Sequence, residues 1–233
     1  TVHLFLEGQN ILKSPSTYAG LCVPEGAVID INDSTNGELE VIGGDGGAGI
    51  GAQAVGPAGT ITINGGKITA TGGIRSAGIG GAVGGGGGTI NINGGEVTAT
   101  GGDGFGNALG GSGIGCGSGG NGGDVIVSGG KVTAIGGENT DSTLADGINC
   151  KNLSSGEGNS ASIVASKINS KINYTDFNGI IWDETKKNGT VYGNALLDEP
   201  LNNQNLKIDK NRTLTISPKG IYAMNGCEFS GSG

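Results

Sequence analysis

Three carboxylates are spaced so that they could bind a metal ion. Asp45, Asp103 and Glu138 each directly follow a glycine pair, at the same place in a recurring sequence pattern in which Ile74 takes that place once. Carboxylate oxygens and backbone carbonyl groups are the ligands that Ca²⁺ prefers. The pattern therefore allows a Ca²⁺ site, and the alternative is that these carboxylates lie separately in solvated turns.

A second candidate site is a group of aromatic residues late in a chain that is only 4% aromatic. An aromatic ring beside polar side chains is typical of ligand pockets. We therefore predict a ligand-binding surface here, with the alternative that the rings fill a wider interior. The predicted binding residues are Tyr174, Phe177, Trp182, Asp183 and Tyr192.

The chain offers few residues for catalysis. It has one histidine, His3, and two arginines, Arg75 and Arg212, and none of them lies in a segment rich in aspartate. Acid–base catalysis usually depends on several such groups that lie close together. We therefore expect no enzymatic activity.

A repeat of roughly 30 residues determines where all these side chains lie. The segments 60–73, 89–102 and 124–137 align without a gap, as TITINGGKITATGG, TININGGEVTATGG and DVIVSGGKVTAIGG. In each segment, two stretches with alternating apolar residues flank a glycine pair. Alternation with a period of two predicts strands, and glycine suits the corners between them. A glycine followed by Ile or Leu marks a third short strand in each repeat.

Three short strands that recur at this interval predict an all-β fold, a right-handed parallel β-helix (solenoid) of about seven coils. The handedness follows from the usual chirality of parallel crossovers. Ile61, Ile63, Ile68 and Ala70 should face the interior. We expect a single domain over 1–233, with N-terminal coils at 1–58, regular glycine-rich coils at 59–152 and less regular coils at 153–233.

Coils in register place equivalent residues in columns along the solenoid. Lys67, Glu96 and Lys131 should form a column of alternating charge. Cys116 and Cys150 should occupy one position of neighbouring coils, either as a disulfide or as stacked buried thiols. The geometry of in-register parallel strands favours the thiols.

The composition suits an extracellular protein. A formal net charge of −8 argues against nucleic acid and anionic membranes as partners. No run of 18 apolar residues is present, so no transmembrane helix is predicted. Because the chain opens directly on the strand-like segment TVHLFLEG, we expect it to be a mature piece or an excised domain.

The segments YAGLCVPEGAVIDI (18–31) and GTITINGGKITATGG (59–73) resemble the glycine-rich repeats of large secreted surface proteins of bacteria. The stretch 179–220 resembles the strand ladder that often follows those repeats. The resemblance implies a build similar to pectin-lyase-like right-handed β-helices and to carbohydrate-binding β-helix modules. It also implies roles in adhesion, polysaccharide binding or as a stalk.

These observations favour a non-catalytic, extracellular β-helical adhesin or carbohydrate-binding domain of a larger bacterial surface protein. Its expected partner is a polysaccharide, a host glycan or another surface ligand, and Ca²⁺ is the candidate cofactor. The alternative is a structural subunit of an extracellular filament, because terminal coils leave strand edges to which another coil can pair. Neither function involves nucleic acid or membrane insertion.

Overall fold

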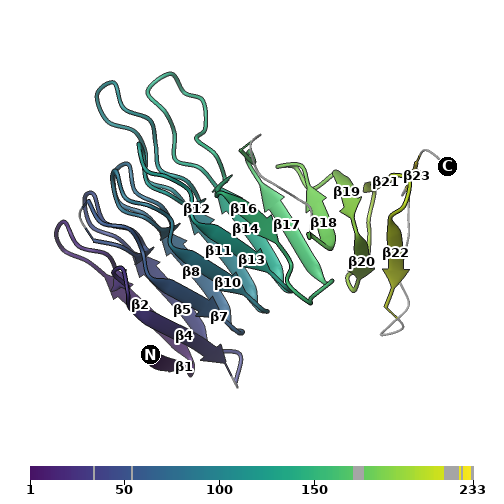
Figure 1. Cartoon of the computed structure of the whole chain (residues 1–233), viewed down its shortest axis with the longest axis horizontal. Coiled ribbons are helices and arrows are strands. Elements are labelled where there is room, and N and C mark those ends of the chain that lie inside the picture. The colour runs from purple at the N-terminus through teal and green to yellow at the C-terminus, as the bar shows by residue number, and fades with distance from the viewer. Residues whose placement is uncertain (34, 54, 170–175, 218–225, 227, 232–233) are drawn as a thin grey trace.

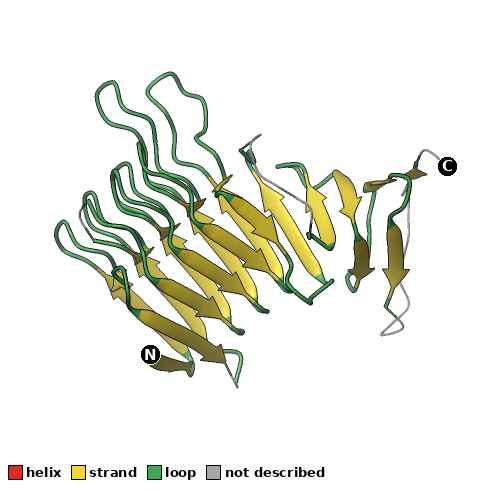
Figure 2. Ribbon diagram, in the orientation of Figure 1, coloured by secondary structure: helices red, strands yellow, loops and turns green. Residues whose placement is uncertain are grey.

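In the computed structural model, the chain winds into a right-handed parallel β-helix (Figure 1). The described residues form strands and loops and no helix, so none of them forms a membrane-spanning helix (Figure 2). The predicted all-β fold is confirmed. The structure describes residues 1–33, 35–53, 55–169, 176–217, 226 and 228–231.

Each of the first five coils contributes one strand to each of three parallel sheets. The first sheet contains β1 (Val2–Leu6), β4 (Val28–Asp33), β7 (Thr60–Ile63), β10 (Thr89–Ile92), β13 (Asp124–Val127) and β16 (Asn152–Ser154). The second begins with β2 (Gln9–Lys13), β5 (Glu38–Ile42), β8 (Lys67–Thr71), β11 (Glu96–Thr100), β14 (Lys131–Ile135) and β17 (Ala161–Ala165). The third consists of β3 (Leu21–Cys22), β6 (Ile50–Gly51), β9 (Ile79–Gly80), β12 (Ile114–Gly115) and β15 (Ile148–Asn149).

The interior is built from columns of identical or similar apolar side chains. Ile61 pairs in register with Ile90, and Ile90 with Val125. All the residues predicted to face inward are fully buried, and alanines fill the narrower column. This continuous apolar core supplies most of the stability of the regular coils. The alanine column consists of Ala70, Ala99 and Ala134.

The outer face carries polar columns in the same register. Asn64 Nδ2 donates a hydrogen bond to Asn32 Oδ1 at 2.9 Å, and Asn93 Nδ2 donates to Asn64 Oδ1 at 2.8 Å. The predicted charge column is also confirmed, because Glu96 pairs with Lys67 on one side and with Lys131 on the other. The exposed asparagine contacts each contribute a few tenths of a kcal/mol and help to fix the register. Lys67 forms an ion pair with Glu38, and Lys131 forms one with Glu199.

Glycine recurs at the second position of the third strand for a steric reason. Gly51, Gly80 and Gly115 adopt φ values of 140°, 130° and 125°. A Cβ atom built on Gly80 would lie 2.0 Å from the carbonyl oxygen of Gly115 in the next coil. In these three coils the corner therefore closes only without a side chain at this position, which Cys22 takes in the first coil and Asn149 in the fifth.

The regular winding ends after β17. A sixth coil holds β16 and β17, with Ile168 bridged to Ile148 of the third sheet, so six coils are regular where about seven are predicted. The next strand pairs parallel with β17, but its successor pairs antiparallel, and the chain thereby reverses direction. The remaining strands are β18 (Gly179–Trp182), β19 (Asn188–Tyr192), β20 (Asn194–Leu197), β21 (Asn205–Ile208), β22 (Thr213–Ile216) and β23 (Glu228–Ser230).

Residues 179–217, here called the C-terminal unit, have an apolar core of their own. Ala161 and Ile163 of β17 face the core of the regular coils. Ser162, on the opposite face of the same strand, is also buried and contacts the C-terminal unit. The second sheet thus packs against the core of the regular coils with one face and against the core of the C-terminal unit with the other. The second core consists of Ile180, Trp182, Val191, Ala195, Leu197, Leu201 and Leu206.

The two ends of the molecule differ, which bears on the predicted filament. The first coil presents the edges of β1, β2 and β3. At the other end, β21 and β23 follow β19 and therefore run opposite to the second-sheet strands of the regular coils. The second sheet, as described, therefore has no end strands of matching direction for a parallel head-to-tail stack, and the filament stays a prediction.

Candidate functional site

The three carboxylates predicted to bind Ca²⁺ do not form one site. Ile74 takes the equivalent position in the coil between Asp45 and Asp103, and all three carboxylate residues are exposed. The Asp103 carboxylate accepts a hydrogen bond from the backbone N–H of Glu138 at 2.8 Å. Among the described residues, no group of three or more His, Cys, Asp or Glu side chains could hold a metal ion. The three side chains therefore do not form one shared metal site, and Ca²⁺ binding by a single carboxylate with backbone carbonyl groups stays a prediction.

The predicted aromatic surface is also corrected, because two of its rings are buried. Trp182 is 2% exposed and belongs to the core of the C-terminal unit. Phe177 is buried against the core of the regular coils, with its ring centroid 5.9 Å from that of Tyr192. Neither side chain can stack on a ligand, and Tyr174 lies outside the described residues.

Asp183, predicted beside these rings, stabilises a turn. Its carboxylate accepts hydrogen bonds from the Lys187 backbone N–H at 2.9 Å and from Asn188 Nδ2 at 2.7 Å. Desolvation raises the pKa of Asp183, but these hydrogen bonds and the one from Thr185 Oγ1 together outweigh it and lower the pKa to about 2. The hydrogen-bonding capacity of Asp183 is thus used by its own loop.

Tyr192 lines a hollow of about 630 Å³, but its ring is covered. The Arg212 guanidinium lies 4.4 Å from the ring centroid of Tyr192, and Arg212 Nη1 donates a hydrogen bond to the Val191 carbonyl oxygen. This cation–π contact occupies the face on which a sugar would stack. The hollow therefore lacks the open aromatic platform predicted for this region.

Cys116 and Cys150 are buried free thiols, as the spacing of the coils favours. Burial raises the pKa of both, and nearby Asp124 and Cys116 add to the effect at Cys150, whose pKa reaches about 12. Because the thiolate is the reactive form, the two side chains act as small apolar core residues. Cys22 is a free thiol at the surface, and Cys227 lies outside the described residues.

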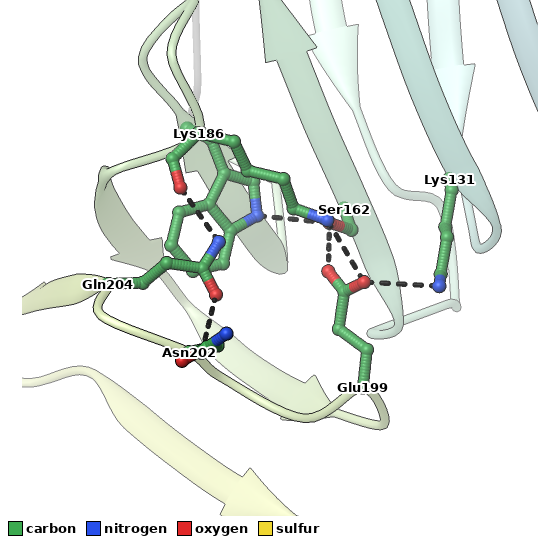
Figure 3. A network of polar contacts seen from close by, with 7 residues as sticks. Lys131, Ser162, Lys186, Glu199, Asn202 and Gln204 are labelled. Carbon is green, nitrogen blue, oxygen red and sulfur yellow. Dashed lines mark hydrogen bonds and ion pairs between the residues drawn. The ribbon is translucent and has the colours of Figure 1, made fainter. Parts of the chain in front are cut away.

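A buried polar network attaches the C-terminal unit to the outer face of the regular coils (Figure 3). Glu199 is 7% exposed, and its Oε1 accepts a hydrogen bond from Ser162 Oγ at 2.9 Å. Its Oε2 accepts one from Lys186 Nζ at 3.0 Å and lies 3.1 Å from Lys131 Nζ. The same Ser162 hydroxyl accepts a hydrogen bond from Trp182 Nε1 at 3.0 Å. Both oxygens of the buried Glu199 carboxylate thus have partners, and these interactions offset the free energy that its desolvation costs.

Replacing Glu199 by glutamine is expected to destabilise the C-terminal unit at neutral pH and to weaken its acid sensitivity. Burial raises the pKa of Glu199, but Lys186, Lys131 and Ser162 outweigh it, so the pKa is lower than usual in the folded protein. A carboxyl group with a lowered pKa stabilises the fold fully above its unfolded pKa of about 4.3. This contribution is lost as the pH falls through the lower folded pKa.

The fluorescence of Trp182, the one tryptophan of the chain, can follow this acid effect during thermal unfolding. At pH 7, Glu199→Gln should cost about 1.5–3 kcal/mol, the range for hydrogen bonds to charged groups. As the pH falls below about 5, the wild-type Tm should fall more steeply than that of Glu199→Gln. Equal slopes would mean that Glu199 does not contribute to the acid sensitivity.

Two long loops depart most clearly from the repeat. Residues 101–113 connect β11 to β12, and residues 136–147 connect β14 to β15, where the two preceding coils have the shorter connections 43–49 and 72–78. We call residues 101–113 and 136–147 the loop pair. They are the two tall loops at the top of Figure 1, and they project from one side of the solenoid.

Hydrogen bonds join the two loops of the pair. The Gly104 N–H donates to the Glu138 carbonyl oxygen at 2.7 Å, and the Gly110 N–H donates to Asn139 Oδ1 at 2.9 Å. The bond from the Glu138 N–H to Asp103 continues this ladder. The loops are therefore already ordered, so little conformational entropy is lost when a ligand binds to them.

Large apolar side chains point into solvent from this loop pair. Phe105 is 73% exposed, Leu109 61% and Leu144 41%. Exposed apolar groups on ordered loops of a rigid scaffold are typical of binding surfaces. These residues were not predicted from the sequence, although apolar side chains in an otherwise glycine-rich and polar segment are a signal that could have found them.

A hollow of about 140 Å³ lies between the loops. Leu109 and Leu144 line it together with Asp146 and Lys167. Asp146 Oδ2 accepts a hydrogen bond from Asn149 Nδ2 at 3.2 Å. Asp146 Oδ1 is buried and accepts no hydrogen bond from the described residues, although Lys167 Nζ lies 3.2 Å away as an ion pair without hydrogen-bond geometry. The Asp146 carboxylate is thus neutralised at the edge of the hollow by the Lys167 ammonium group.

Comparison with known proteins supports a β-helix repeat in the centre of the chain. A family model described as a β-helix repeat matches residues 61–87 and 90–118, which are the third and fourth coils. No curated protein and no solved structure is significantly similar to the chain. The chain therefore contains a β-helix repeat region, in agreement with the architecture described above.

Proposed function

We propose that this chain is a non-catalytic, stiff binding module of a secreted or cell-surface protein and that its loop pair contacts a carbohydrate. The observation that carries the proposal is the exposure of Phe105 and Leu109 on loops that are hydrogen-bonded to each other. Leaving large apolar side chains in water is unfavourable, and a ligand that covers them recovers that free energy.

The surroundings of Phe105 fit a sugar better than a purely apolar ligand. A pyranose presents apolar C–H groups on its faces and hydroxyl groups around its edge. The Phe105 ring suits the apolar faces. The exposed Glu138 carboxylate, together with the Oδ2 atoms of Asp103 and Asp141, whose Oδ1 atoms accept hydrogen bonds within the loops, can accept hydrogen bonds from the hydroxyl groups. The solenoid underneath would hold these groups in fixed positions and would also act as a spacer.

The proposal is tested on a glycan array and by calorimetry with the glycans that bind. The double variant Phe105→Ala/Leu109→Ala should lose at least tenfold in affinity with an unchanged Tm. Val55→Ala is the matched control, because Val55 is 78% exposed but lies outside the loop pair.

Each assay is run in Ca²⁺ and again in EDTA. We expect the same binding in both, because the described residues contain no cluster of metal ligands. Absence of binding to every glycan in both buffers would contradict the carbohydrate function. Binding that survives the double variant would move the site away from the loop pair.

A further inference from the structure

We infer that the hollow beside Tyr192 is a second binding site, which takes the anionic group of an acidic sugar. The hollow has a volume of about 630 Å³. Gly156, which follows β16, lines it together with Lys210 and Arg212 of the turn between β21 and β22. None of the residues that line it belongs to the loop pair. The inference therefore does not depend on the function proposed for the loop pair.

Arg212 is held at the wall of this hollow and keeps hydrogen-bond donors to spare. Its guanidinium lies against the ring of Tyr192, and its Nη1 donates to the Val191 carbonyl oxygen. A guanidinium group has five N–H donors. Among the described residues, Val191 alone accepts a hydrogen bond from Arg212. The remaining donors suit the paired oxygens of a carboxylate or of a similar oxyanion.

The charges that line the hollow favour a ligand with a single negative charge. Neither Lys210 nor Arg212 forms an ion pair with a carboxylate of the described residues. Asp176 lines the same hollow, so two cations stand against one carboxylate. The net charge of −8 on the whole chain disfavours polyanions. At physiological ionic strength, however, charges more than about 8 Å away are largely screened, so the local excess of positive charge attracts a small anion.

The rest of the hollow suits a hydroxylated ligand. The Asp176 carboxylate and the Asn211 side-chain amide both line it, and neither is hydrogen-bonded to a described residue. Hydroxyl groups of a sugar can donate to the first and exchange hydrogen bonds with the second. The volume lies within the range of about 300–1,000 Å³ that is usual for ligand pockets, and an isolated ion would not fill it. Since the ring of Tyr192 is covered by Arg212, polar contacts should dominate the binding.

The test compares three sugars that share one ring and differ in the group at its terminal carbon: glucuronate, glucose 6-sulfate and glucose. Each is titrated into the isotope-labelled full chain, and NMR shift changes of the backbone amides give the affinity. We expect both acidic sugars to bind at least about tenfold more tightly than glucose. Their binding should weaken between about 0.01 M and about 1 M ionic strength, because the Debye length falls from about 30 Å to about 3 Å.

Four variants separate the roles of the charged groups. Arg212→Gln should lower the affinity for glucuronate at least about tenfold, the effect of losing a hydrogen bond to a charged group. Lys210→Gln should lower it about two- to fivefold, as for an exposed ion pair. Asp176→Asn should raise it, because a like charge is removed. Lys187→Gln is the matched control, because Lys187 is an exposed lysine of the C-terminal unit that does not line the hollow.

The outcomes distinguish this site from the loop pair. Equal affinity for the three sugars would overturn the inference, and so would inorganic sulfate that binds as tightly as glucose 6-sulfate. Binding of glucuronate that is unchanged in both Arg212→Gln and Lys210→Gln would place the anion elsewhere. Phe105→Ala/Leu109→Ala should bind glucuronate like the wild type, and a loss there would assign the acidic sugar to the loop pair. If none of the three sugars binds, this site is overturned and the loop pair keeps its own test.

Discussion

Replacing Trp182 by alanine is expected to lower the free energy of unfolding of the C-terminal unit by about 3–5 kcal/mol, the usual cost of such a truncation in a core. Trp182 is the largest fully buried side chain of the described residues. Its ring packs on the backbone of Gly189, where a Cβ atom would lie 2.6 Å from Trp182 Cε3. Alanine would leave a large cavity that this unit cannot close, and it would also remove the hydrogen bond to Ser162.

This loss should be local to the C-terminal unit. The regular coils have a separate core, and the coils of a solenoid contact only their neighbours. Amide hydrogen exchange should therefore become faster in β18–β21 and remain slow in β7, β8, β10 and β11. Phe105→Ala is the control, because truncation of an exposed residue should change stability by no more than about 0.5 kcal/mol. Uniformly faster exchange along the whole chain would contradict the independence of the two cores.

The regular coils could be predicted from the sequence to the level of single residues. Because TITINGGKITATGG aligns with its successors without a gap, the alignment gives the register of the coils directly. Thr69 pairs with Thr98, and Thr98 with Thr133, as that alignment requires. Alternation within each strand then separates inner from outer side chains, since the outer positions are polar.

The C-terminal unit could not be predicted in the same way. In ASIVA (161–165) and GIIW (179–182) most residues of both alternating sets are buried. When both faces of a strand are covered, alternation no longer shows which face is outside. The pattern therefore could not predict the burial of Trp182, the reversal at β19 or the burial of Ser162 on the outer face of the second sheet. The aromatic surface was predicted where a core lies.

The loop pair could be predicted only in part. The interval from Ile79 to Ile114 exceeds that from Ile50 to Ile79, so an insertion is visible in the sequence. Its place in the coil follows from the alignment, because the strands on either side are unchanged in length. The exposure of Phe105 and Leu109 depends on the path of the inserted residues, which no repeat specifies.

Replacing Gly80 by alanine is expected to be among the most destabilising small substitutions in the regular coils. At φ 130° an alanine is strained by about 1–3 kcal/mol. Its Cβ would also lie 2.0 Å from the Gly115 carbonyl oxygen, a backbone atom of the next coil that can move only if the coil itself moves. We therefore expect a loss of more than about 3 kcal/mol in the free energy of unfolding, or failure to fold.

Urea denaturation followed by circular dichroism measures this loss, and Gly56→Ala is its matched control. A Cβ on Gly56 would meet only the Gln53 carbonyl oxygen, at 3.7 Å, and Gly56 does not adopt a left-handed φ. Alanine should therefore leave stability unchanged there or raise it by about 0.4–1 kcal/mol, because it restricts the unfolded chain. Similar midpoints for the two variants would mean that the third corner can widen to accept a side chain. The glycines at 51, 80 and 115 would then need another explanation than the close approach of successive coils.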